Sequence, residues 1–239
     1  MNDSFSTPSV PARPPTPRRT PAWRQTRSRK NRSHYHHGNL RAALLQAGRE
    51  LIAERGIEGI TLRQVAQRAG VSHTAPYHHF PDKAALVEGL AVAGYEELER
   101  RLKAAKNRTK GPASAKLEGL GLAYVRFAIE QTAQFQLMYR PELRSQPTFD
   151  SKTSLPSAVA AASGAALEVL FDAIEAGQRD GSIVEGDVNP LALACWSIVH
   201  GFAVIVLDRL MLDPVPPKAA QATLRQVLRV LQTGLETAR

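Results

Sequence analysis

The sequence predicts an all-α protein, with a small N-terminal helix-turn-helix domain of three helices followed by a larger α-helical domain. Three observations lead to this prediction. Apolar residues recur at steps of three and four along most of the chain after residue 38, which is the spacing of one helix face. Side chains that cap helices precede several of these stretches, and glycine or proline follows them. Two short helical stretches meet at Gly70 within residues 60–86, in the pattern of a helix-turn-helix.

Residues 1–34 form a basic arm that is rich in proline and poor in apolar residues, and we expect it to be disordered. The arm holds eight Lys or Arg residues against the single acid Asp3, a net charge of +7, whereas the other 205 residues sum to +2. It lacks the apolar segment of a secretory signal. Two roles stay open: the arm adds phosphate contacts to a bound polyanion, or it is a solvated tail without a role.

The first predicted helix runs from Asn39 to Arg55, and Gly56 ends it. Its apolar side chains share one face, so this helix is expected to pack under the two that follow. The residues of that face are Leu40, Leu44, Ala47, Gly48, Leu51 and Ile52.

The second predicted helix begins after Thr61. Thr61 and Gln64 have the spacing of a capping box, and Ile60 before the cap can pack on Val65 one turn into the helix. Gly70 supplies the left-handed residue that ends a helix. These signals together define the first half of the helix-turn-helix.

The third predicted helix runs from His73 to about Phe80, with Ser72 as its N-cap. In helix-turn-helix proteins this helix lies in the major groove of DNA. Pro76 forfeits the first hydrogen bond within the helix, so its opening turn is expected to be tight or tilted. Asp82 caps the next helix. Hydroxyl and imidazole groups bond base edges or phosphates, a methyl group contacts thymine, and a lysine on the flank meets a phosphate. The candidates of these kinds are His73, Thr74, Ala75, Tyr77, His78 and Lys83.

The pattern GVSxxxxYxxFxxK, from Gly70 to Lys83, resembles the TetR family of bacterial transcriptional regulators. YHHGNLRAALLQAG from Tyr35 is similar to the opening of many members, which extends the resemblance to about Leu102. The resemblance implies a homodimer with an N-terminal DNA-binding domain and an all-helical ligand-sensing domain. It also implies that Tyr77 meets the DNA backbone, although a core aromatic at this position stays an alternative. Further candidate DNA contacts are Tyr35, His36, His37, Thr61, Arg63 and Ser72.

Residues 103–115 lose apolar periodicity and contain Gly111 and Pro112, so we place the domain boundary there. The helix-turn-helix domain then spans 35–103 and the C-terminal regulatory and dimerisation domain spans 113–239. In the second domain Asn189 is expected to cap a helix whose first position is Pro190. The helices expected there cover about 114–139, 156–180, 189–207 and 217–238.

The helix over 114–139 carries an apolar stripe with Gln131 in its middle. Ligand sites are apolar walls with a few polar groups, so this stripe is a candidate pocket wall, and a plain core is the alternative. Trp196, His200 and Gly201 in WSIVHG resemble the WHG subgroup of TetR C-terminal domains, as does FQLMYRPEL at 135–143. His200 either bonds a neighbouring carbonyl or presents its imidazole to a ligand. The candidate pocket residues are Tyr124, Phe127, Gln131, Phe135, Trp196 and His200.

Residues 190–207 are long and apolar enough to be considered as a membrane span. Ser197 and His200 in the middle, and Asp208 with Arg209 directly after it, argue against a membrane. A helix that is apolar all round also fits between its own domain and a partner, as in a four-helix bundle formed by two copies. The candidate dimer residues are Phe202, Leu224, Leu228, Leu231 and Leu235.

Composition and motifs exclude several classes of protein. Cys195 is the only cysteine, which excludes an intrachain disulfide and fits a reducing cytosol. His34, His36 and His37 have no carboxylate or cysteine beside them to close a metal site, and no nucleophile elbow, zinc helix or phosphate loop is present, so we expect no cofactor and no enzyme.

The sequence therefore predicts a cytoplasmic DNA-binding transcriptional regulator that associates with the nucleoid when bound to DNA. It is expected to act as a repressor that binds a palindromic operator in double-stranded DNA as a homodimer and is released by a small-molecule effector. The alternative is a non-specific architectural DNA-binding protein driven by the basic arm.

Overall fold

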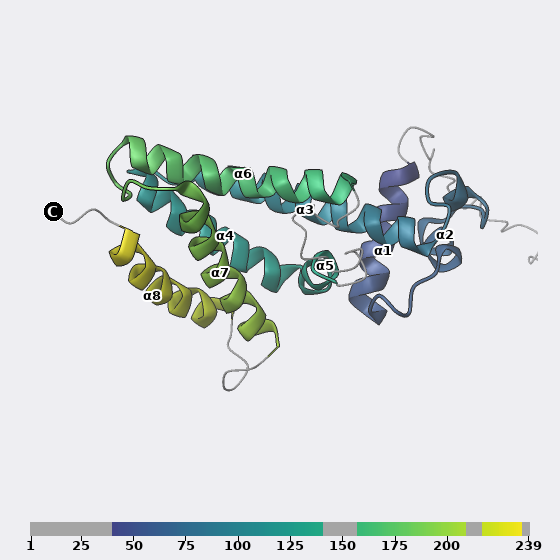
Figure 1. Cartoon of the computed structure of the whole chain (residues 1–239). Helices are drawn as coiled ribbons and strands as arrows, with labels where there is room; N and C mark the ends of the chain where they lie inside the picture. Colours follow the sequence, from purple (N-terminus) through teal and green to yellow (C-terminus); the bar gives the residue numbers. More distant parts are fainter. Residues whose placement is uncertain (1–39, 141–156, 209–216, 236–239) are drawn as a thin grey trace, which may run out of the picture. The chain divides into compact units, whose positions relative to one another are not determined.

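A computed structural model describes residues 40–140, 157–208 and 217–235, which belong to one compact unit, Gly38–Arg239. Within these ranges the elements are helices (Figure 1). The predictions for the basic arm and for Tyr35, His36 and His37 lie outside the described residues. In chain order the elements are α1 (Leu40–Arg55), α2 (Leu62–Ala69), η2 (Ala75–His78), α3 (Lys83–Arg108), α4 (Ala113–Glu130), α5 (Thr132–Met138), α6 (Ser157–Arg179), α7 (Val188–Leu207) and α8 (Pro217–Leu235).

Local signals set both ends of α2, as predicted. Thr61 Oγ1 accepts a hydrogen bond from the Gln64 amide at 3.2 Å. Gly70 follows the helix at φ 71°, a left-handed conformation that lets its amide and that of Val71 reach carbonyls of the last turn. Ile60 and Val65 are fully buried, so the residue before the cap belongs to the same core as the helix. The first half of the helix-turn-helix is therefore confirmed.

The second half of the helix-turn-helix is shorter and tighter than predicted. The α-helix expected from His73 to Phe80 is replaced by a turn and the single 3₁₀ turn η2. The Ala75 amide donates to the Ser72 carbonyl at 3.1 Å, three residues back. Pro76 is the reason, because it has no N–H for that same carbonyl and an α-helical bond cannot form there.

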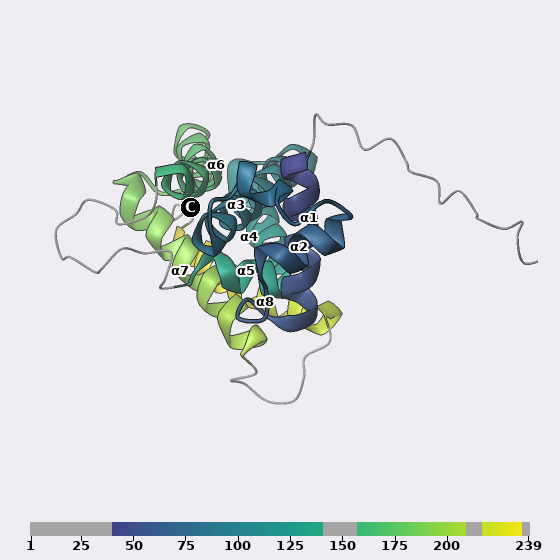
Figure 2. The ribbon, with the colours of Figure 1, turned by 90° about the vertical axis from the view of Figure 1, so that its right-hand side faces the viewer.

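Helix α3 starts at its predicted cap, where Asp82 Oδ1 accepts the Ala85 amide at 2.8 Å, and runs for 26 residues. Its early residues Leu86 and Leu90 are fully buried in the core shared with α1. Its later turns pack on α4, α5 and α6, and both views show α3 and α6 side by side (Figures 1 and 2). The break after α3, at residues 109–112, falls within the stretch predicted as a boundary.

The helix predicted over 114–139 is in fact two helices. Gln131 ends α4 with φ −124° and ψ 44°, and Figure 1 shows α5 turned away from the direction of α4. As a result α5 lies against α1 and α3. Gln134 is buried in this contact, and its Nε2 donates to the Leu90 carbonyl at 2.6 Å. Helix α5 therefore joins the later helices to the helix-turn-helix.

Helix α7 begins slightly earlier than predicted, because Asp187 rather than Asn189 caps it through a 2.9 Å bond to the Asn189 amide. Among the helices of the described residues, α7 is the one whose length and apolar composition would allow it to cross a membrane, judged by these two properties alone. It buries a narrow stripe in its own protein, and its other sides are exposed or half-buried. The stripe consists of Ala192, Cys195, Val199 and Ala203.

Two residues predicted for a dimer interface lie in the protein's own core instead. Leu224 is 0% and Leu228 4% exposed, because α8 packs this face on α4. A Cβ added at Gly121 of α4 would lie only 3.1 Å from Leu228 Cδ1, which shows how closely the helices approach. Leu231 is half-buried, and the side chain of Leu235 lies outside the described residues.

Gly94→Ala is expected to lower the free energy of unfolding by about 1–3 kcal/mol, because overpacking forces buried groups to shift. A Cβ at Gly94 would lie 2.5 Å from Gln134 Nε2 and 2.7 Å from Met138 Sδ on α5. Urea denaturation gives the measurement. Gly164→Ala on α6 is the matched control; its Cβ meets nothing within 4 Å, so it should stabilise the helix by about 0.5–1 kcal/mol. Equal effects of the two changes would contradict this packing.

Candidate DNA-binding surface and internal cavity

The helix-turn-helix presents a polar surface around η2. The predicted contacts that are exposed there are Thr61, Arg63, Ser72, His73, Thr74, Tyr77 and His78, and Ala75 is half-buried. Tyr77 is 55% exposed, which contradicts the alternative that it is a core aromatic. Hydroxyls, imidazoles and a guanidinium are therefore presented together where DNA can reach them.

Buried neighbours fix the position of η2. Pro76 and Phe80 are buried on its inner side, and the Phe80 amide donates to the Pro76 carbonyl at 2.9 Å. The guanidinium of Arg41 lies 5.6 Å from the centre of the Phe80 ring. A Cβ at Gly89 would meet that ring at 2.8 Å, so Phe80 rests directly on α3. Because Phe80 and η2 rest on the first turns of α3, the position of Tyr77 depends on those turns.

Lys83, predicted to meet a DNA phosphate, is bonded within the protein. Its Nζ donates to the backbone carbonyl of Glu58 at 3.2 Å, and Arg140 Nη2 lies 2.7 Å from a carboxylate oxygen of the same Glu58. The turn between α1 and α2 is thus connected to the start of α3 and to Arg140, two residues after the end of α5. These partners are 25 and 82 residues apart, so no local sequence pattern announces them.

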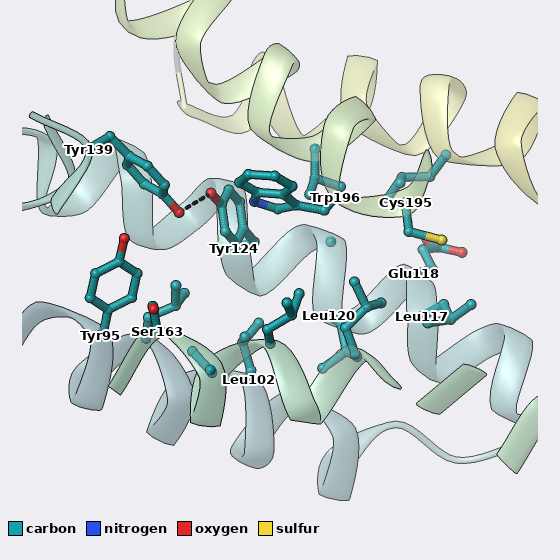
Figure 3. A pocket seen from close by; sticks show the side chains of 18 of the residues that line it. Tyr95, Leu102, Leu117, Glu118, Leu120, Tyr124, Tyr139, Ser163, Cys195 and Trp196 are labelled. Carbon is teal, nitrogen blue, oxygen red and sulfur yellow. Dashed lines mark hydrogen bonds between the residues drawn. The ribbon is translucent and has the colours of Figure 1, made fainter. Parts of the chain in front are cut away.

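A cavity of about 410 Å³ lies among α3, α4, α6, α7 and α8, with Tyr139 from the end of α5 at its rim (Figure 3). Its volume is in the range of small-molecule sites, and its wall is mostly aliphatic and aromatic. The wall includes Tyr95, Leu102, Leu117, Glu118, Leu120, Tyr124, Tyr139, Ser163, Cys195 and Trp196.

Three tyrosines gather at one end of the cavity. The hydroxyls of Tyr124 and Tyr139 are 2.8 Å apart, and the Tyr95 ring packs edge-on against the Tyr139 ring with 6.1 Å between the ring centres (Figure 3). The Tyr124 oxygen also lies 2.9 Å from His200 Nδ1. The phenol of Tyr95 donates to the Met138 carbonyl at 3.2 Å. Hydrogen bonds at this end therefore link α3 to α5, and link α4 both to Tyr139 and to α7.

These phenols are uncharged at neutral pH. Burial raises the pKa of Tyr124 to about 12, although hydrogen bonds with Tyr139 and Trp196 lower it. Burial likewise raises the pKa of Tyr139 well above its ordinary value. Each phenol therefore offers one hydrogen and its lone pairs, and no negative charge.

The opposite end of the cavity holds Glu118 and Cys195 (Figure 3). Glu118 lies 3.7 Å from the Arg225 side chain, which balances its charge. Burial raises the pKa of the Cys195 thiol to about 11, so it stays protonated at neutral pH and behaves as a small apolar group. Neither residue forms an activated nucleophile.

The predicted pocket residues fall into three groups. Tyr124 and Trp196 line the cavity, and His200 reaches it through its bond to Tyr124. Phe127 and Phe135 are buried in the core and are not part of the wall. Gln131, expected as a polar group of the pocket, is exposed at the junction of α4 and α5, because the helix ends there.

Sequence reasoning missed the polar groups that α3, α5 and α6 contribute to the cavity, namely Tyr95, Tyr139 and Ser163. Only Tyr139 had a signal, since it lies within the FQLMYRPEL stretch that resembles the WHG subgroup. Tyr95 and Ser163 occur in ordinary helical contexts, and only the packing of α3 and α6 brings them together.

Raising the pH from about 10 to about 12 is expected to lower the free energy of unfolding. An unfolded phenol ionises near pH 10.0 and Tyr124 in the folded protein near pH 12, so the folded state binds more protons in this window and loses stability as the pH rises. Urea denaturation across this range measures the slope. Tyr124→Phe should make the slope shallower, and a slope unaffected by it would contradict the burial of this phenol.

Comparisons with known proteins agree with these features. A model of bacterial regulatory proteins of the tetR family matches residues 44–90, and a model of the tetracyclin repressor-like C-terminal domain matches residues 117–232. The transcriptional repressor KstR2 of Mycobacterium tuberculosis is 33% identical over 112 residues, 46% of this chain and 55% of the relative. The class C tetracycline repressor of Escherichia coli is 43% identical over 53 residues, 22% of this chain and 24% of the relative. The chain thus spans about half the length of the first relative and a quarter of the second.

Solved structures extend the likeness over most of the chain. A Rhodococcus protein of unknown function is 31% identical with a TM-score of 0.73, over 86% of this chain and 100% of that one. FadR of Bacillus subtilis, solved with stearoyl-CoA, shares the fold at 20% identity and a TM-score of 0.64, over 81% of this chain and 98% of that one. The two family models together cover the helix-turn-helix and the helices around the cavity. The two relatives named above are repressors rather than enzymes. The chain belongs to the TetR family of bacterial regulatory proteins.

Proposed function

We propose that the protein is a DNA-binding transcriptional repressor that binds a palindromic operator as a homodimer and is released by a small molecule in its cavity. The observation that carries this proposal is the exposed polar surface around η2, held in place by α3. The relatives named as transcriptional repressors support it. Two copies related by a two-fold axis would present two such surfaces to successive turns of one DNA face.

Tyr77 and its neighbours suit contacts with a duplex. The exposed phenol of Tyr77 can donate to a phosphate oxygen, which positions the protein on the backbone. His73 and Thr74 stand at the start of the turn that leads into η2, where side chains reach base edges in the major groove. Arg63 on α2 is exposed, and its guanidinium can donate two parallel hydrogen bonds to one phosphate.

The cavity and the DNA surface share structural elements, so a ligand can act on DNA binding. Tyr95 of the cavity wall lies on α3, whose start supports Phe80 and η2. Arg140, next to Tyr139 of the wall, pairs with Glu58 beside the helix-turn-helix. An effector that fits the cavity better when these elements have shifted would reduce the population competent for DNA.

The dimer interface is assigned to the outer faces of α7 and α8. Leu193 is 59% and Val230 78% exposed, and Phe202 is only half-buried. Contiguous apolar side chains on a surface mark contacts with a partner. A second copy that covers these faces would complete a four-helix bundle and needs no membrane to explain the apolar composition of α7.

Tyr77→Ala is expected to weaken operator binding by about tenfold or more, because a hydrogen bond to a charged phosphate contributes about 1.5–3 kcal/mol. The measurement is a gel shift on a fragment selected by the purified protein from random DNA. Tyr77→Phe keeps the ring and tests the hydroxyl alone. An unchanged midpoint for Tyr77→Ala would remove this residue from the DNA contact.

The same selection separates the repressor from an architectural protein driven by the basic arm. A repressor that lacks residues 1–34 should keep its sequence preference and show a shallower dependence of affinity on salt. If binding vanishes with the arm, or if selection yields no preferred sequence, the proposed function fails and the alternative replaces it.

Val230→Asp is expected to shift the monomer–dimer equilibrium toward monomers by at least about tenfold, because it places an unpaired charge in an apolar interface. Sedimentation equilibrium gives the measurement. Val230→Thr, which keeps the shape without the charge, is the matched control and should remain dimeric. A Val230→Asp dimer as tight as the wild type would locate the interface elsewhere.

A further inference from the structure

We propose that the cavity takes an uncharged molecule of hydrocarbon character and holds it by shape and apolar contact, without a hydrogen bond to the wall. This ligand class rests on the proposed function only in that the molecule is then the effector of the repressor. Three properties of the cavity support it: polar groups of the wall are already paired within the protein, the described wall offers no net charge, and the volume suits a molecule of a few rings.

The hydrogen-bonding capacity of the tyrosine end is used within the protein. A phenol oxygen has one hydrogen to donate and two lone pairs that accept. The Tyr139 hydroxyl bonds with Tyr124 at 2.8 Å, and Trp196 and Tyr95 are its two further partners. The Tyr124 hydroxyl, besides this bond, has Trp196 as a partner and lies 2.9 Å from His200 Nδ1. Each of the two oxygens therefore has three partners, as many as a phenol can take, and keeps no position for a ligand.

Two further polar groups of the wall also have partners in the protein. The Ser163 hydroxyl donates to the Ala160 carbonyl of its own helix at 3.0 Å, so it has no hydrogen left for a ligand acceptor. The Glu118 carboxylate lies 3.7 Å from the Arg225 side chain. A ligand hydroxyl or amide buried against this wall would lose its water without gaining a full set of partners, which weakens binding.

The charges along the wall argue against an ionic ligand. Among the described residues that line the cavity, Glu118 is the charged one. A carboxylate or phosphate buried in the cavity would lose its water without gaining a cation, and Glu118 would repel it. A cation gains little either, because Arg225 balances the charge of Glu118. An uncharged ligand avoids both costs.

The apolar wall and the volume of the cavity set the size of the ligand. Figure 3 shows Leu102 and Leu120 between the tyrosine end and the end formed by Glu118 and Cys195. An apolar cavity of about 150 Å³ stays dry and binds one benzene molecule. The cavity here measures about 410 Å³. It therefore has room for about two to three such rings, or for an aliphatic body of similar volume, which gains free energy by leaving water.

The experiment compares three molecules that share one body and differ in head group, namely biphenyl, 4-phenylphenol and biphenyl-4-carboxylate. Binding is measured by the fluorescence of Trp196, which lines the cavity, in a Trp23→Phe protein that has no other indole. Biphenyl is expected to bind at least about fivefold more tightly than 4-phenylphenol, because the buried hydroxyl loses its water without full compensation. The carboxylate is expected to bind at least about a hundredfold more weakly than biphenyl, because a buried charge without a partner costs more.

A substitution at Gly164 tests whether biphenyl occupies this cavity. Gly164 lines the cavity, and a Cβ added there meets nothing within 4 Å, so a larger side chain enters open space without displacing a neighbour. Gly164→Leu is expected to weaken biphenyl binding by at least about tenfold, because the leucine takes up the volume that the ligand needs. Gly201→Leu on α7 is the matched control; its Cβ also meets nothing within 4 Å, and Gly201 is not part of the wall, so the affinity should stay unchanged.

Binding of 4-phenylphenol or of the carboxylate as tight as that of biphenyl would overturn the proposal, and so would failure of biphenyl to bind. An affinity that Gly164→Leu leaves unchanged in a folded protein would also overturn it. The comparison of head groups uses the cavity without this substitution, so it decides the ligand class even where Gly164→Leu does not fold.

Release of the protein from its selected DNA by biphenyl is measured separately by gel shift. Binding of biphenyl without DNA release supports the ligand class and counts against the proposed function. DNA release by 4-phenylphenol or the carboxylate but not by biphenyl supports the proposed function and overturns the ligand class.

Discussion

The packing of α3 against α1 at one end and α4 to α6 along the rest is the constraint on which the other features depend. Its first turns carry Gly89, on which the Phe80 ring and with it η2 rest. Its middle turns supply Tyr95 and Leu102 to the cavity wall. Close-packed interiors resist compression and transmit strain. A ligand that moves the wall and a duplex that needs η2 in one place therefore act on the same rigid element.

Helix α5 provides a second connection between the helix-turn-helix and the later helices. The buried side-chain amide of Gln134 shows that the hydrogen-bonding groups in this contact are not all paired. Gln134 donates to the Leu90 carbonyl, but its Oε1 is buried and has no hydrogen-bond partner among the described residues. An unsatisfied buried acceptor costs about 1–3 kcal/mol. The contact between α5 and α3 carries this cost in the arrangement that the structure shows. Packed contacts of this kind switch between discrete arrangements rather than deform gradually.

The features that the sequence predicts correctly are those that depend on residues close together in the chain. The caps at Thr61 and Asp82 and the stop at Gly70 depend on residues within four positions, and the structure confirms them. Pro76 predicted a tight opening turn, but the structure replaces the whole expected α-helix by a turn and the 3₁₀ turn η2. The end of α4 at Gln131 has no breaker residue, and it arises because α5 packs on α1 and α3 instead of continuing along α4. The cavity joins side chains from α3, α4, α6, α7 and α8 and from Tyr139, so a pattern on one stretch of sequence wrongly predicted Phe127, Phe135 and Gln131 as part of its wall.

Helix α7 explains why composition alone could not distinguish a membrane span from a partner surface. One side supplies Trp196 and Cys195 to the cavity, and other sides stay open to a second copy. Two apolar contacts on opposite sides require a helix that is apolar all round, which is also what a lipid environment requires. If the outer side binds a second copy, ligand and partner share this helix, and by linkage each changes the affinity of the other by the same factor. An effector that turns Trp196 would then alter the spacing of the two DNA surfaces through the dimer as well as through α3.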